Sequence, residues 1–288
     1  MGMTNLIGRL LSRRFFPNPI FLVGGSRSGT IVLLKALGQH PSILSSPSEN
    51  PFVTDVGRFA YELATANAHD TQYYERSVRL SRDQIFDRLR ELVFESSMGE
   101  NRGAQFLARQ LLRERVNVFG KRYWCTKTFP GETTARGLQA LYPGTHFVWI
   151  LRNGMSVVHS RTKFPEFKDL PFAEHCRHWN SSIERFAYLR TSPAATVVHQ
   201  EELTDDPDAV FRRIFQGIGV AYDPASTEFA RHTHVHPLAD LETTAGVNVK
   251  QVLSERKPPH ETWTNEQRAV FKEICGRSME LAGYVMPY

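Results

Sequence analysis

The feature that most constrains this 288-residue chain is the segment 20–34, IFLVGGSRSGTIVLL. The apolar residues 20–23 are typical of a buried strand, the Gly, Ser and Arg residues at 24–29 indicate a tight loop, and an apolar helix is expected from Thr30. A strand that feeds a glycine-rich loop and then a helix N-terminus suits an anion, because backbone N–H groups converge there and the helix dipole favours negative charge. The segment therefore predicts an anion site.

The loop differs from the phosphate loop of nucleoside triphosphatases in the position of its cation. Gly24 and Gly29 have the required spacing, but Thr30 and Ile31 stand where that motif has Lys and Ser or Thr. The cation lies inside the loop instead, at Arg27. Such a loop can hold a phosphate, yet it lacks the magnesium-binding hydroxyl beside a lysine that nucleotide hydrolysis normally uses.

Composition narrows the classes of function. Lys and Arg number 35 against 30 Asp and Glu, which gives a net charge of +5 and a pI near 9.2. This modest, dispersed excess favours an anionic small ligand and argues against nucleic-acid binding. No run of about 18 apolar residues occurs, so no membrane span is expected. The three cysteines are odd in number and far apart. They argue against a disulfide framework and favour a reducing, cytoplasmic location.

Residues 1–18 are interpreted as an N-terminal extension. Their apolar stretch is too short for a signal peptide, so we expect a frayed or packed terminus. A short basic helix on a membrane surface is the alternative.

Strand and helix patterns alternate along the chain. The segment 145–151, THFVWIL, is apolar almost throughout, as in a strand buried on both faces of a parallel sheet. Residues 55–118 read as a helical insertion that covers the site or shapes an acceptor pocket. By contrast, 45–51 has turn composition, which places Glu49 and Asn50 on a loop. We expect a single α/β domain over 1–288, with a P-loop-like, doubly wound parallel sheet flanked by helices.

Five segments, taken in their order along the chain, resemble parts of the sulfotransferases that use 3′-phosphoadenosine-5′-phosphosulfate (PAPS). GGSRSGT resembles their 5′-phosphosulfate loop, in the bacterial and Golgi form with Arg for Lys. Residues 147–161 resemble the 3′-phosphate motif of the family, and residues 127–130 resemble its Lys-Thr-Pro segment. Residues 197–207 resemble a strand and loop of the family, and residues 281–284 resemble its C-terminal Leu-Gly-Tyr.

Three positions depart from the family pattern. Ile31 replaces a second Thr that could reach the donor, Asn153-Gly154 replaces Asp-Pro, and Gln200 replaces a Tyr. None of these changes removes an expected cation, so the resemblance still implies a sulfotransferase that moves the sulfuryl group of PAPS to a hydroxyl or amine without a metal.

The resemblance and the residue types together give a donor site. Arg27 can meet the charge that builds on the bridging oxygen of the departing phosphate, because a guanidinium grips two oxygens and stays protonated. Arg152 ends a strand and Ser160 follows eight residues later, near the same helix face, where both could hold the 3′-phosphate. A plain turn and a strand-end ion pair are the structural alternatives. The residues expected to bind the donor are Gly25, Ser26, Arg27, Ser28, Gly29, Thr30, Arg152, Ser160, Arg256 and Lys257. For Arg256 and Lys257, a solvated charged loop is the alternative.

Glu49 is the candidate base for the acceptor hydroxyl, since the resemblance implies a carboxylate after the first helix. Lys127 is the candidate cation for the sulfuryl oxygens. Together with Arg27 they form the predicted catalytic set. A surface Glu and a structural Lys are the respective alternatives.

Two groups of histidines suggest a metal site without matching a recognised zinc spacing. They are His232, His234 and His236, and His175 with Cys176 and His178. We expect them to be packing or surface residues.

Two other functions are compatible with the loop. A P-loop kinase or NTPase would have a lysine after Gly29 and an acid after 145–151, where the chain has Thr30 and Arg152. A binding module that kept the fold and lost the chemistry is the second, and Ile31 makes it conceivable. The acceptor, a small molecule, carbohydrate, lipid or peptide, is not encoded in any motif.

Overall fold

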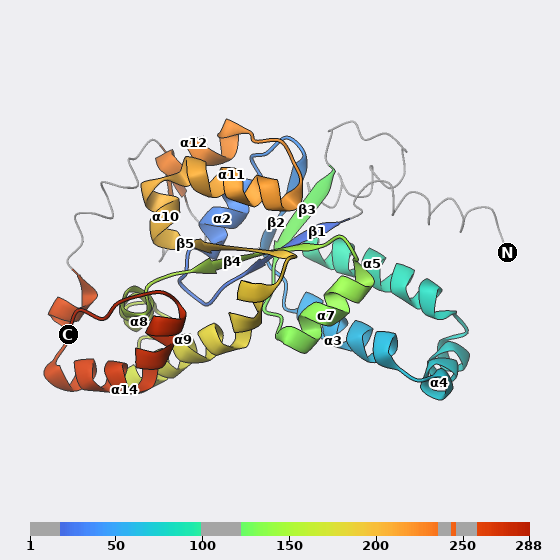
Figure 1. Cartoon of the computed structure of the whole chain (residues 1–288), viewed down its shortest axis with the longest axis horizontal. Helices are drawn as coiled ribbons and strands as arrows, with labels where there is room; N and C mark the ends of the chain where they lie inside the picture. Colours follow the sequence, from blue (N-terminus) through green and yellow to red (C-terminus); the bar gives the residue numbers. More distant parts are fainter. Residues whose placement is uncertain (1–17, 99–121, 236–242, 246–257) are drawn as a thin grey trace. The chain divides into compact units, whose positions relative to one another are not determined.

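The computed structural model of the chain describes residues 18–98, 122–235, 243–245 and 258–288 (Figure 1). The chain divides into two compact units. The first unit is Met1–Leu22 with Leu37–Phe147, and the second unit is Val23–Ala36 with Val148–Tyr288. The single-domain organisation expected over 1–288 stays a prediction.

A five-stranded parallel sheet has the strand order β2-β3-β1-β4-β5, which confirms the predicted α/β class. Its strands are β1 (Pro19–Val23), β2 (Ile43–Glu49), β3 (Tyr123–Lys127), β4 (His146–Leu151) and β5 (Ala195–His199). Every residue of β1 and β4 is buried, as their apolar composition predicts. The order reverses beside β1. The carboxyl ends of the strands at such a switch point are where open α/β sheets bind their ligands.

In the first unit, β3 pairs in parallel with both β1 and β2. The predicted loop at 45–51 is wrong for its first five residues, because Ser45 to Glu49 belong to β2. Proline suits an edge strand, and a register shift between Ser45 and Glu49 accommodates Pro47. Pairing with β3 thus overrides the local turn composition.

The helices of the first unit are α3 (Phe52–Thr65), α4 (Ala68–Val78), α5 (Arg82–Met98) and α7 (Glu132–Leu141). Residues 99–118 of the expected insertion lie outside the described residues. Beneath the helices, the Phe21 ring meets Trp124 edge-on at 6.0 Å and lies 5.7 Å from Phe147. These aromatic rings form the core of the unit.

The close packing of α3 on α7 depends on two glycines (Figure 1). A Cβ atom added to Gly137 would lie 1.8 Å from the carbonyl oxygen of Gly57, and one added to Gly57 would lie 2.7 Å from Thr134. The two helix backbones therefore touch at a distance that only glycine permits.

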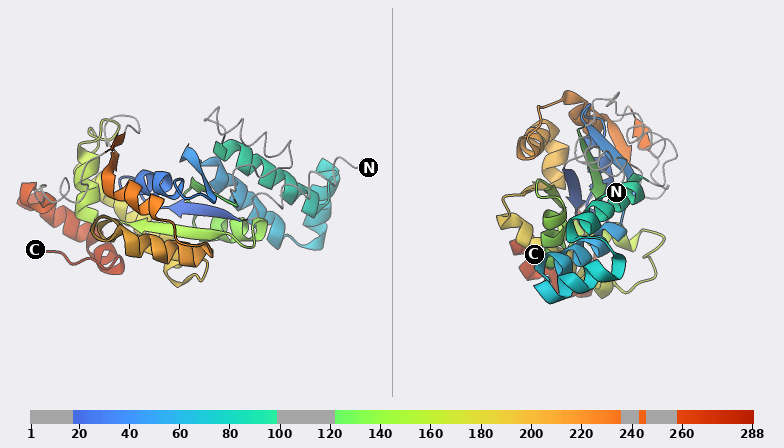
Figure 2. Two further views of the ribbon diagram at one scale, coloured as in Figure 1. Left: turned by 90° about the horizontal axis from the view of Figure 1, so that it is seen from above. Right: turned by 90° about the vertical axis from the view of Figure 1, so that its right-hand side faces the viewer.

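The helices of the second unit are α2 (Thr30–Leu37), α8 (Gly154–Thr162), α9 (Phe172–Phe186), α10 (Gln200–Asp205), α11 (Pro207–Ile218), α12 (Pro224–His232) and α14 (Asn265–Leu281). The last residue of α2, Leu37, belongs to the first unit. The second unit also contains two short 3₁₀ turns and a hairpin of β6 (Thr233–Val235) and β7 (Thr243–Ala245). Helices α9 and α14 lie side by side in the views of Figures 1 and 2. The Trp179 ring of α9 stacks on Phe271 of α14 at 6.4 Å.

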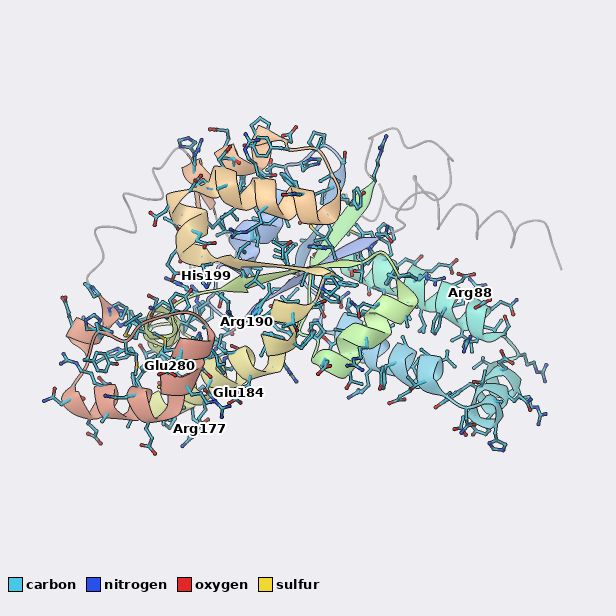
Figure 3. The ribbon with its side chains drawn as sticks, viewed as in Figure 1. Arg88, Arg177, Glu184, Arg190, His199 and Glu280 are labelled. Carbon is cyan, nitrogen blue, oxygen red and sulfur yellow. The ribbon has the colours of Figure 1, made fainter. Side chains whose placement is uncertain are left out.

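Helix α9 has a buried stripe that includes Cys176, Trp179 and Ile183. The charged side chains of Arg177 and Glu184, labelled in Figure 3, are exposed on the same helix. This separation of apolar and charged faces is what orients α9. None of the helices that the structure describes is long and apolar enough to cross a membrane.

We expect Gly137→Ala to lower the free energy of unfolding by roughly 2–4 kcal/mol, because the added methyl forces α3 and α7 apart. Urea titration measures the change. Gly276→Ala in α14 is the matched control, since only the end of Met286 lies within 4 Å of a Cβ added there. An equal effect of the two substitutions would refute the close approach of α3 to α7.

Candidate functional site

The loop after β1, residues 24–29, lies in the second unit and requires glycine at its start. A Cβ added to Gly24 would lie 2.9 Å from Ile150 of β4, and one added to Gly25 would lie 2.8 Å from Ser182 of α9. The loop ends at the N-terminus of α2, where Leu33 N–H donates to the Gly29 carbonyl at 3.2 Å. It therefore runs close to β4 and α9 before the helix begins.

Two residues of this loop have left-handed backbone conformations. Gly29 has φ of 89°, and Arg27 has φ of 67°, which is uncommon for a residue with a side chain. Turns that mix left- and right-handed residues direct successive N–H groups into one concavity that suits an anion. Keeping an arginine in this conformation costs about 1–2 kcal/mol. Such strain is concentrated at functional positions.

The side chain of Arg27 contacts α8. Its Nε donates to Ser160 Oγ at 3.2 Å, and its guanidinium lies 4.6 Å from the centroid of the Phe164 ring. Burial lowers the pKa of Arg27. Two of the predicted site residues, 133 positions apart, are thus in direct contact.

Arg152 binds the same loop from the carboxyl end of β4. Its Nη1 donates to the Arg27 carbonyl at 2.8 Å, while its own carbonyl accepts from Trp179 Nε1 at 3.3 Å. The structure therefore brings Arg27, Arg152 and Ser160 together around residues 24–29. Ser26, Ser28 and Thr30 belong to this loop or begin α2.

The departure at 153–154 has a physical explanation. Asn153 caps α8 as an Asp would, because its Oδ1 accepts from Met155 N–H at 3.0 Å. A Cβ at Gly154 would lie 2.9 Å from three atoms of the Trp179 ring. Glycine is needed where this indole covers the start of α8.

The other two departures differ in how far the structure explains them. Gln200 packs on the loop, because its Cγ would lie 3.1 Å from a Cβ atom added to Gly29. Its Nε2 also donates a hydrogen bond to Thr204 Oγ1 at 2.9 Å. Nothing in the described structure explains Ile31.

A hydrogen-bonded chain supports the end of β4 and was missed from the sequence. Glu201 accepts from the Asn153 N–H at 3.0 Å and from Tyr284 Oη at 2.7 Å. Desolvation, followed by the Glu201 charge, raises the pKa of Tyr284. Glu201 and Tyr284 lie in segments that carry the family resemblance, 197–207 and 281–284. That resemblance is the sequence signal from which their positioning role could have been predicted.

In the first unit, Glu49 and Lys127 contact each other. They are register partners at the ends of β2 and β3, and Lys127 Nζ donates to the Glu49 carboxylate. Lys127 is 6% exposed, whereas the Glu49 side chain is 46% exposed. The Lys127 ammonium also lies 4.9 Å from the Phe129 ring centroid. The predicted base and the predicted sulfuryl cation are therefore a half-buried ion pair.

Several predicted residues lie outside the described residues, namely Arg256, Lys257 and His236. No group of three or more His, Cys, Asp or Glu residues suited to a metal occurs in the part of the chain that the structure describes. Cys125, Cys176 and Cys275 are buried, and none of them forms a disulfide among the residues that the structure describes.

Comparisons with known proteins bear on the family and the fold of the chain. The family model described as the Sulfotransferase family matches residues 19–224. Nodulation protein NoeE of Sinorhizobium fredii is 25% identical over 249 residues, which are 76% of this chain and 54% of that protein. The chain thus spans about half the length of this curated relative. The sulfotransferase domain from the curacin biosynthetic pathway has a TM-score of 0.54 at 16% identity and covers 95% of this chain and 100% of its own, which shows the shared fold.

Arg27→Gly should be more stable than Arg27→Ala by about 1 kcal/mol, because both lose the guanidinium and only glycine relieves the left-handed backbone. Thermal or urea unfolding of the two variants tests this. Arg79, with φ of 54° at the exposed end of α4, is the control and should show the same difference. If the two Arg27 variants were equally stable while the glycine variant of Arg79 was more stable than its alanine variant, backbone strain at Arg27 would be contradicted.

Proposed function

The chain belongs to the sulfotransferase family, and on that premise we propose that it transfers the sulfuryl group of PAPS to a hydroxyl or amine of an acceptor. The observation that carries the proposal is the junction of Arg27, Arg152 and Ser160 around the loop 24–29. This cluster of cations and donors suits a ligand with anionic groups at both ends. An NTPase is less well supported, since Thr30 stands in the place of the phosphate-loop lysine.

The donor fits the chemistry of the residues present. The backbone N–H groups of loop 24–29 would bind a 5′-phosphosulfate at the N-terminus of α2, and Arg27 would lie beside it. Arg152 and Ser160 would hold the 3′-phosphate. Arg256 and Lys257, from outside the described residues, complete this proposed set.

In the proposed reaction, the acceptor oxygen attacks sulfur while the bond from sulfur to the bridging phosphate oxygen breaks. The electron pair passes to that oxygen, and 3′,5′-adenosine bisphosphate leaves. Arg27 would stabilise the developing negative charge, since guanidinium donors act most strongly where charge appears in the transition state. Glu49 would accept the acceptor's proton, and Lys127 would hold the sulfuryl oxygens.

The proposed acceptor carries the hydroxyl or amine that receives the sulfuryl group. The exposed apolar residues of the first unit include Phe52 and Tyr73, on α3 and α4. The acceptor screen below includes small molecules, carbohydrates, lipids and peptides.

Calorimetry with 3′,5′-adenosine bisphosphate in EDTA tests donor use. We expect binding to wild type, and a loss of about tenfold or more in Arg152→Ala, because one charge-assisted contact to phosphate is removed. Arg27→Ala should retain bisphosphate binding within about tenfold yet lower transfer from radiolabelled PAPS by about 10²–10³-fold. Absence of bisphosphate binding to wild type would refute PAPS use, and transfer at the wild-type rate by Arg27→Ala would refute the role of Arg27.

Glu49→Gln should lower kcat by about 10²–10⁴-fold with the best acceptor from a panel of phenols, sugars, lipids and peptides, and leave bisphosphate affinity unchanged. The amide keeps the shape and a hydrogen-bond acceptor for Lys127 while removing the base. Glu132→Gln, which breaks an exposed pair with Arg136 in the same unit, is the control. An unchanged rate would mean that Glu49 only pairs with Lys127.

A further inference from the structure

Arg161 is a buried cation that the proposed reaction does not use. It follows Ser160 on α8, within the second unit, and is only 2% exposed. Its Nε and Nη1 are buried without a hydrogen-bond partner among the residues that the structure describes. A buried guanidinium with unpaired N–H groups is costly, and such groups are normally paired.

An aromatic contact explains only part of this burial. The Arg161 guanidinium lies 4.2 Å from the centroid of the Phe167 ring, and Phe167 lies 5.5 Å from Phe164, the ring that Arg27 covers. Two arginines therefore flank one pair of rings. A ring satisfies the face of a guanidinium, whereas its N–H groups point outward in the guanidinium plane and still need oxygen acceptors.

The charge that acts on Arg161 is also positive. Desolvation, and then the charge of Arg27, lower the pKa of Arg161. Burial, and then the charge of Arg161, lower the pKa of His175 and of His178 on α9. The lowered pKa favours the neutral imidazole on both residues, so neither histidine carries a charge that compensates Arg161.

Carboxylates do not compensate this charge. The acidic group that acts on the pKa of His175 is Glu174, and its carboxylate binds Arg177. Neither Arg27 nor Arg161 takes part in any ion pair found among the described residues, 18–98, 122–235, 243–245 and 258–288. The second unit thus holds two neighbouring arginines without a counter-ion from the described chain.

We propose that Arg161 is the cation of a further oxyanion subsite beside Arg27, occupied by an anionic substrate group such as a sulfonate, carboxylate or phosphate. The proposal rests on the proposed function for the identity of that substrate. Loop 24–29, Arg152 and Ser160 are already assigned to the two phosphates of the donor. The oxyanion at Arg161 is therefore either the sulfonate in transit or an anionic group of the acceptor. The second alternative would make the chain selective for charged acceptors.

The first test compares Arg161→Met with Arg177→Met, the same change at an exposed arginine of α9 (Figure 3). In ligand-free protein, Arg161→Met should raise Tm by about 2–4 °C, because it removes a buried charge that has no partner. Arg177→Met should leave Tm nearly unchanged. A clear fall in Tm of Arg161→Met would overturn the proposal, since it would mean that the arginine stabilises the empty fold.

The second test adds sodium sulfate to protein saturated with 3′,5′-adenosine bisphosphate, against sodium chloride at equal ionic strength. We expect a saturable rise in Tm for wild type and Arg177→Met, a weaker rise for Arg161→Lys, and none for Arg161→Met. An identical sulfate response in wild type and Arg161→Met would refute the subsite. If the bisphosphate fails to bind wild type, the proposed donor is wrong, and the sulfate titration run without it still tests Arg161.

Donor affinities distinguish the two sources of the oxyanion. If Arg161 holds the sulfonate in transit, Arg161→Met should lose at least about tenfold in PAPS affinity while binding the bisphosphate as wild type does. If it holds an acceptor group, both donor affinities should stay within about twofold, and KM should rise only for charged acceptors. A loss of bisphosphate affinity as large as that of Arg152→Ala would place Arg161 in the phosphate site and overturn the proposal.

Discussion

The hydrogen bonds that join Arg27 to the end of β4 and to α8 are the contacts on which the rest of the candidate site depends. Arg152 holds the backbone of the loop through the Arg27 carbonyl, and Ser160 holds the Arg27 side chain. One residue therefore receives contacts from two elements that are remote in sequence. Because its backbone is left-handed, Arg27 would relax elsewhere without them. For the anion binding proposed above, these contacts would pre-organise the loop and so reduce the entropy lost on binding.

These contacts are themselves supported by residues that touch no proposed ligand atom. Glu201 accepts from the backbone of Asn153, directly after Arg152, and Tyr284 donates to Glu201 from the last segment of the chain. On the other side, Trp179 binds the Arg152 carbonyl and covers Gly154. The position of Arg152 is thus determined by β4, α9, α10 and the C-terminal segment together. This explains why segments as distant as 197–207 and 281–284 carry the family resemblance.

The sequence predicted the parts of the structure that depend on local pattern. The strand, loop and helix at 20–34 and the buried strand β4 follow from apolar runs and glycine positions. The anion-binding role of the residues at the strand ends stays a prediction. It failed at β2, where pairing with β3 outweighs a turn-like composition. It also missed the contact of Glu49 with Lys127, the ring of Phe164 under Arg27, and the chain from Asn153 to Tyr284. These depend on which distant residues meet, and no local period encodes that.

The choice of arginine at 27 and 161 follows from where the charges lie. A lysine placed in a half-buried position next to another cation would readily lose its proton, because desolvation and repulsion both favour the neutral amine. The guanidinium of Arg27 keeps its charge even though burial lowers its pKa, because its reference value is so high. Arginine therefore lets the second unit concentrate positive charge around one pair of aromatic rings. Under the proposed oxyanion binding, this charge would lower stability in the absence of a ligand and would provide an electrostatic field already oriented toward the incoming oxyanion, as expected where stability and function compete.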